Sequence, residues 1–257
     1  MGDWLNPWPA VKRALVFSLD TLQSQVDVSG WKAFLKMTVG VVVFWHLYTP
    51  IHELLHVAAC LLGGGTVTEL ALKPQYGGVL LQEVLPFVVP DSEYAGQLTG
   101  FSVPNYWVYA MVDLFPYLLS LPGLALMVAA RRIGSPFLFS LALILAFVPL
   151  FSIPGDFYEL VSLATTQVAE SFMPWLDSGV LVSDDVFRSV AGLRSAGEWN
   201  LGLALLVLGG LAGAMYLAGL MLVVQCRIAA RLPGAEELAA ADPVVESGHL
   251  AVKSAQS

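Results

Sequence analysis

Residues 37–62 read MTVGVVVFWHLYTPIHELLHVAACLL, and the only formally charged residue among them is Glu53. A helix rises about 1.5 Å per residue, so a stretch of this length crosses the roughly 30 Å of hydrocarbon in a bilayer. Lys32 and Lys36 precede the stretch, and Gly63-Gly64-Gly65 ends it. The sequence therefore predicts a membrane-spanning helix here.

The composition of the whole chain agrees with a membrane protein. Of its 257 residues, 57% are hydrophobic and 12% are charged, whereas a soluble domain carries about 25% charged residues. The net charge of −8 argues against nucleic-acid binding, which requires clustered Lys and Arg. We expect the lipid bilayer to be the main surroundings of this chain.

Further apolar segments organise the rest of the chain. We expect an all-α polytopic membrane protein of about four transmembrane helices, and up to six if interfacial pieces insert. The predicted spans are 37–62, 107–130, 137–154 and 201–224. They belong to an integral membrane domain, 31–232, which follows an interfacial amphipathic segment, 1–30, and precedes a disordered polar tail, 233–257.

Two shorter segments do not fit a spanning helix. Thr66 to Val89 is divided by Lys73-Pro74, Gly77-Gly78 and Pro86 into short apolar pieces, which predicts a short membrane-associated strand or re-entrant region. Phe157 to Trp175 is expected to form an amphipathic or shorter helix.

Basic residues indicate the orientation, because cytoplasmic flanks carry an excess of Lys and Arg. With four spans and both termini inside, nine of the twelve basic residues lie on the inner side. The inner set is Lys12, Arg13, Lys32, Lys36, Arg131, Arg132, Arg227, Arg231 and Lys253, and the outer set is Lys73, Arg188 and Arg194. We expect an integral protein of the cell (plasma) membrane with cytoplasmic N- and C-termini.

The first span carries the motif His52-Glu53-Leu54-Leu55-His56. Residues four apart share a helix face, so His52 and His56 can bind one Zn²⁺ while Glu53 serves as general base. Ionisable residues are expensive in hydrocarbon, which favours a functional role. Pro50 lies just before the motif and predicts a kink there.

Zinc in a catalytic site takes three protein ligands and leaves one position open for water. Asp156, in Pro154-Gly155-Asp156, is our first candidate for the third ligand, because the Pro-Gly break lets its carboxylate turn inward at a similar depth. Helix N-capping is the ordinary alternative role for Asp156. Glu159 and Asp113 are the other candidates, and Asp113 is also expected to hydrogen-bond within the bundle or to line a polar path.

These residues resemble the site-2 proteases, a family of intramembrane zinc metalloproteases. The resemblance covers roughly Trp45 to Leu160 and rests on the His52 to His56 motif, on Gly77-Gly78-Val79 and on Pro154-Gly155-Asp156. The family also has an Asn-containing motif, for which Asn105 is the nearest counterpart. The resemblance implies that two histidines and a distal aspartate hold zinc and that the glutamate activates water to cut a substrate helix within the membrane.

We therefore expect an intramembrane zinc metalloendopeptidase whose partner is a transmembrane protein substrate. Three alternatives stay open: a catalytically inactive binding or regulatory protein with the same fold, a metal-dependent membrane enzyme acting on a non-peptide substrate, and an ion-coupled transporter that uses Asp113 and the histidines. The small residues around Gly209-Gly210 and Gly213 predict a face on which another helix packs closely, and a homo-oligomer through that face.

Overall fold

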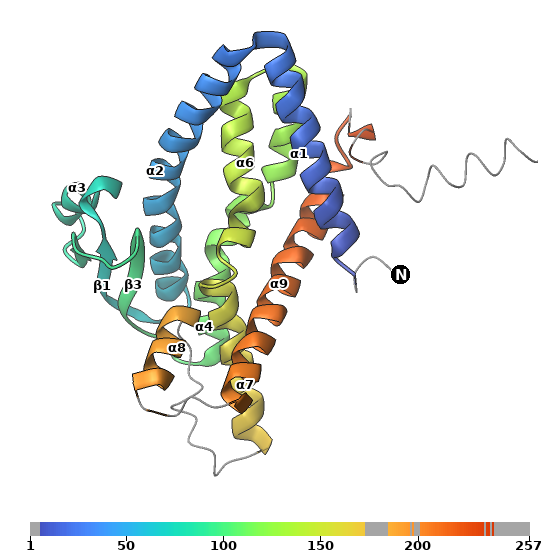
Figure 1. Ribbon diagram of the computed structural model, residues 1–257. Helices are drawn as coiled ribbons and strands as arrows, with labels where there is room; N and C mark the ends of the chain where they lie inside the picture. Colours follow the sequence, from blue (N-terminus) through green and yellow to red (C-terminus); the bar gives the residue numbers. More distant parts are fainter. Residues whose placement is uncertain are drawn as a thin grey trace, which may run out of the picture. The chain divides into compact units, whose positions relative to one another are not determined.

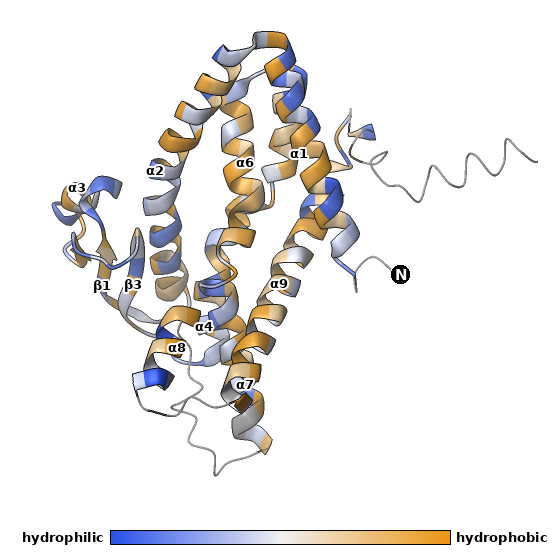
Figure 2. Cartoon of the chain, in the orientation of Figure 1, coloured by the Kyte–Doolittle hydropathy of each residue, from blue (hydrophilic) through white to orange (hydrophobic). Residues whose placement is uncertain are grey.

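The computed structural model describes residues 6–172, 185–195, 197, 201–233, 235, 236 and 238. The described chain is mostly helical and contains one small sheet. Four helical stretches are long and apolar enough to cross a membrane, namely Trp31–Leu62, Tyr106–Ile133, Pro136–Val168 and Ala204–Ala229. This number agrees with the four spans predicted from the sequence. Figure 2 shows how strongly apolar residues dominate α6 (Pro136–Phe151) and α9 (Leu201–Ala229).

The chain divides into two compact units. One unit comprises the described residues of Met1–Val42, Leu119–Val148 and Gly219–Ser257, and the other comprises those of Val43–Leu118 and Pro149–Ala218. Three of the four unit boundaries fall inside α2 (Trp31–Leu62), α6 and α9, and the fourth lies between Leu118 and Leu119. The two histidines of the motif and the three candidate acidic ligands all belong to the second unit.

In the first unit, α1 (Trp8–Ser29) packs on α5 (Gly123–Ile133). Its inner face is buried at Ala10, Ala14, Phe17, Ser18, Thr21 and Gln25. The Gln25 side chain donates a 3.1 Å hydrogen bond to the Ala130 carbonyl of α5. The predicted amphipathic segment is therefore a helix with one packed face, and its position at a membrane interface stays a prediction.

A buried glutamine joins three helices of the same unit. Gln225 of α9 is fully buried, and its Oε1 accepts a 3.2 Å hydrogen bond from the Leu124 N–H, in the first turn of α5. Its Nε2 donates to the Ala146 carbonyl of α6 at 3.1 Å. One side chain thus satisfies an otherwise unpaired helix-terminal N–H and a backbone carbonyl.

The sheet belongs to the second unit and has the order β2-β1-β3. Strand β1 (Thr66–Leu72) is central; it pairs in parallel with β2 (Val88–Val89) and antiparallel with β3 (Gly96–Ser102). Figure 1 shows β1 and β3 side by side. The strand-like region that the sequence predicts ends at residue 89, and it therefore does not include β3, the longer partner of β1.

Two short elements connect β1 to β2: the 3₁₀ helix η2 (Pro74–Tyr76) and α3 (Gly78–Gln82). Gly77, between them, has a φ of 88°, which favours glycine. At Gly78 a Cβ atom would lie 2.0 Å from the Leu72 carbonyl oxygen. The Gly77-Gly78 pair is thus required by the turn that follows β1.

Proline breaks two of the predicted spans. The stretch predicted as 107–130 consists of α4 (Tyr106–Leu114), the 3₁₀ helix η3 (Phe115–Ser120) and α5. Pro116 and Pro122 lie at these junctions, where a proline cannot donate the backbone hydrogen bond of an α-helix. The span predicted as 137–154 ends at Phe151, and after a turn at residues 152–155 the chain continues as α7 (Asp156–Phe172).

Two more helices complete the described chain, α8 (Val186–Ser195) and α9. A Cβ at Gly210 of α9 would lie 2.7 Å from the Tyr158 ring, and one at Gly213 would lie 3.0 Å from Val161, both in α7. The small-residue face therefore packs on a helix of the same chain, and the homo-oligomer stays a prediction. Residues 173–175 of the segment predicted to end at Trp175, and nearly all of the predicted tail, lie outside the described residues.

Candidate metal centre

The two histidines lie on one face of α2, which continues as a helix through Pro50. Their Nε2 atoms are 3.1 Å apart, and the rings meet edge to face with centroids 4.8 Å apart. The His56 residue is 7% exposed and the His52 side chain 11%. Helical spacing thus brings two imidazole nitrogens together in a nearly buried place, as the sequence predicts.

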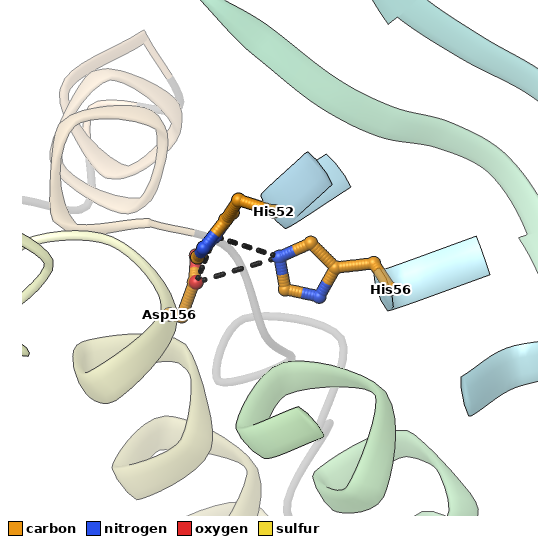
Figure 3. Close-up of side chains that lie close together, drawn as sticks. All are labelled: His52, His56 and Asp156. Atoms are coloured by element: carbon orange, nitrogen blue, oxygen red, sulfur yellow. Dashed lines mark hydrogen bonds and ion pairs between the residues drawn. The ribbon is translucent and has the colours of Figure 1, made fainter. Parts of the chain in front are cut away.

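Asp156 supplies the third group. Its Oδ2 lies 3.3 Å from His52 Nε2 and 3.5 Å from His56 Nε2, and Figure 3 shows the carboxylate reaching the two rings from α7. Among the described residues this is the one group of three or more His, Cys, Asp or Glu whose ligand atoms lie close enough to hold a metal ion, all within 4.8 Å of one another. Asp156 is also the first residue of α7, directly after the Pro154-Gly155 turn.

The other two candidate ligands lie outside this group. Glu159 Oε1 accepts a short hydrogen bond from the Tyr109 hydroxyl of α4. Asp113, also on α4, is 5% exposed, and its Oδ2 has no hydrogen-bond partner among the described residues. The geometry therefore favours Asp156 over both as the companion of the histidines.

The backbone of α4 fixes the ring of His56. Its Nδ1 lies 2.8 Å from the Val112 carbonyl oxygen, and because a carbonyl can only accept, Nδ1 must carry the hydrogen. In a regular helix that carbonyl would accept from the N–H four residues later, but residue 116 is proline and has none. Pro116 thus leaves a carbonyl free, and His56 uses it.

His52 and Asp156 are held by two tyrosines. The Tyr48 hydroxyl, one helical turn before His52, lies 2.9 Å from His52 Nδ1. The fully buried Tyr117 donates its hydroxyl hydrogen to Asp156 Oδ2 at 2.6 Å and places its ring edge to face with His52. In protein metal sites, hydrogen bonds from neighbouring side chains orient the residues that bind the metal.

The contact with Val112 fixes what His56 presents: with hydrogen on Nδ1, its neutral ring offers only a lone pair at Nε2. His52 offers the same when its Nδ1 donates to the Tyr48 hydroxyl, and the ionised carboxylate of Asp156 offers only lone pairs as well. Three acceptors facing one another repel unless a cation lies among them. Two imidazoles and one carboxylate suit Zn²⁺ and leave a fourth position open. The residues present therefore fit a zinc ion.

Glu53 lies beside His52, His56 and Asp156, which we call the metal group. It is 8% exposed and interacts electrostatically with His52, His56 and Asp156. Its side chain lies against the first residue of β3: a Cβ atom at Gly96 would be 2.5 Å from Glu53 Cγ and 2.9 Å from Cδ. The carboxylate of the predicted general base is therefore held between the metal group and the sheet.

Sequence reasoning missed several residues of this site. Tyr48 had a usable signal, since it lies four residues before His52 on the same helix face. Val112 had one too, because Pro116 follows it by four residues. Tyr117 and Gly96 reach the site only through tertiary packing and carry no local signal. Asn105, the nearest counterpart of the family's asparagine motif, caps α4 by accepting a 3.1 Å hydrogen bond from the Val108 N–H.

Comparison of the chain with protein-family models, with curated proteins and with solved structures found no match.

Proposed function

We propose that this chain is an intramembrane zinc metalloprotease in which His52, His56 and Asp156 hold the metal. One observation carries the proposal: three possible ligand atoms, from His52, His56 and Asp156, lie within 4.8 Å of one another, while Val112 and Tyr48 contact the far nitrogens of the two rings. A site of this composition is costly in an apolar chain unless it binds a cation.

Zinc bound there would act as a Lewis acid and lower the pKa of water to about 7. Glu53 would then accept a proton from the attacking water on its carboxylate and deliver it to the leaving amide nitrogen. The buried surroundings of Glu53 and its closeness to the three ligands suit that role. Asp156 would balance part of the charge and hold the third ligand position.

The expected substrate is a membrane-embedded peptide segment. The histidines lie in a candidate span, and α2 exposes many large apolar side chains, including Val39, Val43 and Ile51. A helical substrate hides its peptide bonds, so it must be unwound and held extended. The outer edge of β3 has no strand partner among the described residues, and an extended segment added to that edge would lie near Glu53.

The resemblance to site-2 proteases is part of the proposal. It is supported by the placing of His52, His56 and Asp156 in one group and by the turn that Gly77 and Gly78 form. A position in the plasma membrane with both termini in the cytoplasm, inferred from the basic residues, also remains a proposal.

Zinc analysis combined with a cleavage assay tests the function. The purified protein would be incubated in detergent with tagged reporters that contain one transmembrane helix with a central Asn-Pro break. We expect about one zinc per chain in the wild type and in Glu53→Gln, with cleavage by the wild type alone. Zinc content near zero in the wild type, equal to that of His56→Ala, would refute the metal site, and cleavage by Glu53→Gln would refute its mechanism.

Asp113 favours one alternative, an ion-coupled transporter, because its buried Oδ2 has no partner among the described residues. A transporter would show ion flux in vesicles that Asp113→Asn abolishes and that chelators leave unchanged. A protease without transport activity would show no such ion flux.

A further inference from the structure

Arg188 of α8 contacts three side chains at the start of β3 and just before it, those of Glu93, Tyr94 and Gln97. Its Nη2 donates to Gln97 Oε1 at 2.9 Å and lies 3.4 Å from Glu93 Oε2. Its guanidinium also lies over the Tyr94 ring, 5.8 Å from the centroid. Glu93 is 76% exposed at its side chain, so that ion pair is weak. The shorter bond to Gln97, from a charged donor, is the strongest of the three.

The start of α8 is itself anchored close to the metal group. Asp185 caps the helix, with its Oδ1 accepting from the backbone N–H groups of Phe187 and Arg188 at 2.8 and 3.0 Å. The Val186 N–H donates to the Pro154 carbonyl at 2.9 Å, two residues before Asp156. The helix that carries Arg188 is therefore tied to the turn that presents the third ligand.

The residue held next to Gln97 is Gly96, whose backbone lies against Glu53. A Cβ at Gly96 would approach Glu53 Cγ to 2.5 Å, closer than nonbonded carbon atoms come. The same segment is further held by Lys73, whose backbone N–H donates to the Ala95 carbonyl at 3.1 Å. Movement of this segment would change the space available to the Glu53 carboxylate.

We infer that Arg188 and Gly96 are positioning residues for Glu53: Arg188 holds the first residues of β3 in place, and Gly96 lets them lie directly against the Glu53 side chain. The inference rests on the proposed function for its effect on catalysis. A general base must be placed within a fraction of an ångström, and a 1 Å error can lower a rate about 100-fold. The contacts of Arg188 described above are with Glu93, Tyr94 and Gln97, none of which is a proposed metal ligand, so its loss should leave zinc in place.

The first experiment compares Arg188→Ala with Arg194→Ala, an exposed arginine of the same helix. We expect Arg188→Ala to lower kcat on the reporter at least about tenfold, with KM within about threefold and zinc content unchanged. It should also speed amide hydrogen exchange at residues 95–97, whereas Arg194→Ala should change neither. Arg188→Lys keeps the charge but lacks the planar guanidinium that lies over the Tyr94 ring. It should also lower kcat, and it serves as the second variant should Arg188→Ala fail to fold. Wild-type kcat and exchange in the Arg188 variants would overturn the inference.

The second experiment does not depend on proteolysis. Gly96→Ala should lower the Tm by about 5 °C through overpacking. In a Glu53→Ala background the closest clash is gone and the flexible end of Leu72, with Cδ1 2.9 Å from the added methyl, can give way, so the loss should be less than half as large. Equal losses in both backgrounds would show that Gly96 does not act through Glu53. If the wild type cleaves no reporter but Gly96→Ala costs less in the Glu53→Ala background, the proposed function is refuted, whereas the packing of Gly96 against Glu53 is confirmed.

Discussion

Replacing Tyr117 with Phe removes one oxygen atom and keeps the ring that packs on His52 and Phe157. The hydroxyl of this fully buried residue donates the 2.6 Å hydrogen bond to Asp156 Oδ2 and also interacts with the Ser152 side chain; the loss that bears on the metal is the bond to Asp156. A hydrogen bond to a charged group contributes about 1.5–3 kcal/mol. Since 1.4 kcal/mol corresponds to a factor of ten, we expect zinc affinity to fall about 10–100-fold.

Two effects of the substitution oppose each other. Without the Tyr117 donor, Asp156 becomes a slightly stronger electron donor, which favours zinc, but its carboxylate also loses the bond that orients it. The lost orientation of the carboxylate should be the larger effect, because losing a hydrogen bond that orients a metal ligand typically weakens metal binding 10–100-fold.

Competition against a chromophoric chelator in detergent would measure the zinc affinity. Tyr109→Phe is the matched control, because its hydroxyl serves Glu159 instead of a ligand in the metal group. Equal or tighter zinc binding by Tyr117→Phe would refute the assignment of Asp156 as an oriented ligand.

Further measurements test the ligand set and the packing. Asp156→Ala should lose zinc in metal analysis while Asp113→Ala and Glu159→Ala keep it; zinc loss from either of the latter two instead would reassign the third ligand. Removing zinc with a chelator should lower the Tm by about 5–10 °C, because free zinc at about 100 times Kd contributes about 2.7 kcal/mol; no change in Tm would argue against a bound ion. Gln225→Leu should reduce the free energy of unfolding by about 1–3 kcal/mol, since it leaves the Leu124 N–H buried without its acceptor; an unchanged denaturation midpoint would contradict this account.

The features that the sequence predicts correctly depend on periodicity and composition. His52 and His56 share a face because the helical repeat is fixed locally, and four apolar stretches stand out whatever their neighbours are. The Pro-Gly break before Asp156, which predicts that its carboxylate turns inward, is also a local signal. The structure brings these three residues into one group.

The missed features depend on tertiary pairing. Strand β3 contains two glycines, Gly96 and Gly100, which lower its strand propensity, and it is a strand because β1 pairs with it. The second span was predicted as one helix because hydropathy does not register the N–H that Pro116 lacks. Contacts such as that of Tyr117 with Asp156 join residues far apart in sequence and leave no periodic trace.

The hydrogen bond from His56 to the Val112 carbonyl determines where the site tolerates mutation. Every amino acid at position 112 offers the same carbonyl, so no exchange of that side chain removes the acceptor as such. An amide hydrogen at position 116 would instead compete for that carbonyl. The tautomer of a histidine on one helix is thus encoded by an imino acid on another, at a position outside the group of three candidate ligands. A search for the determinants of metal binding that is confined to ligand side chains would overlook Pro116.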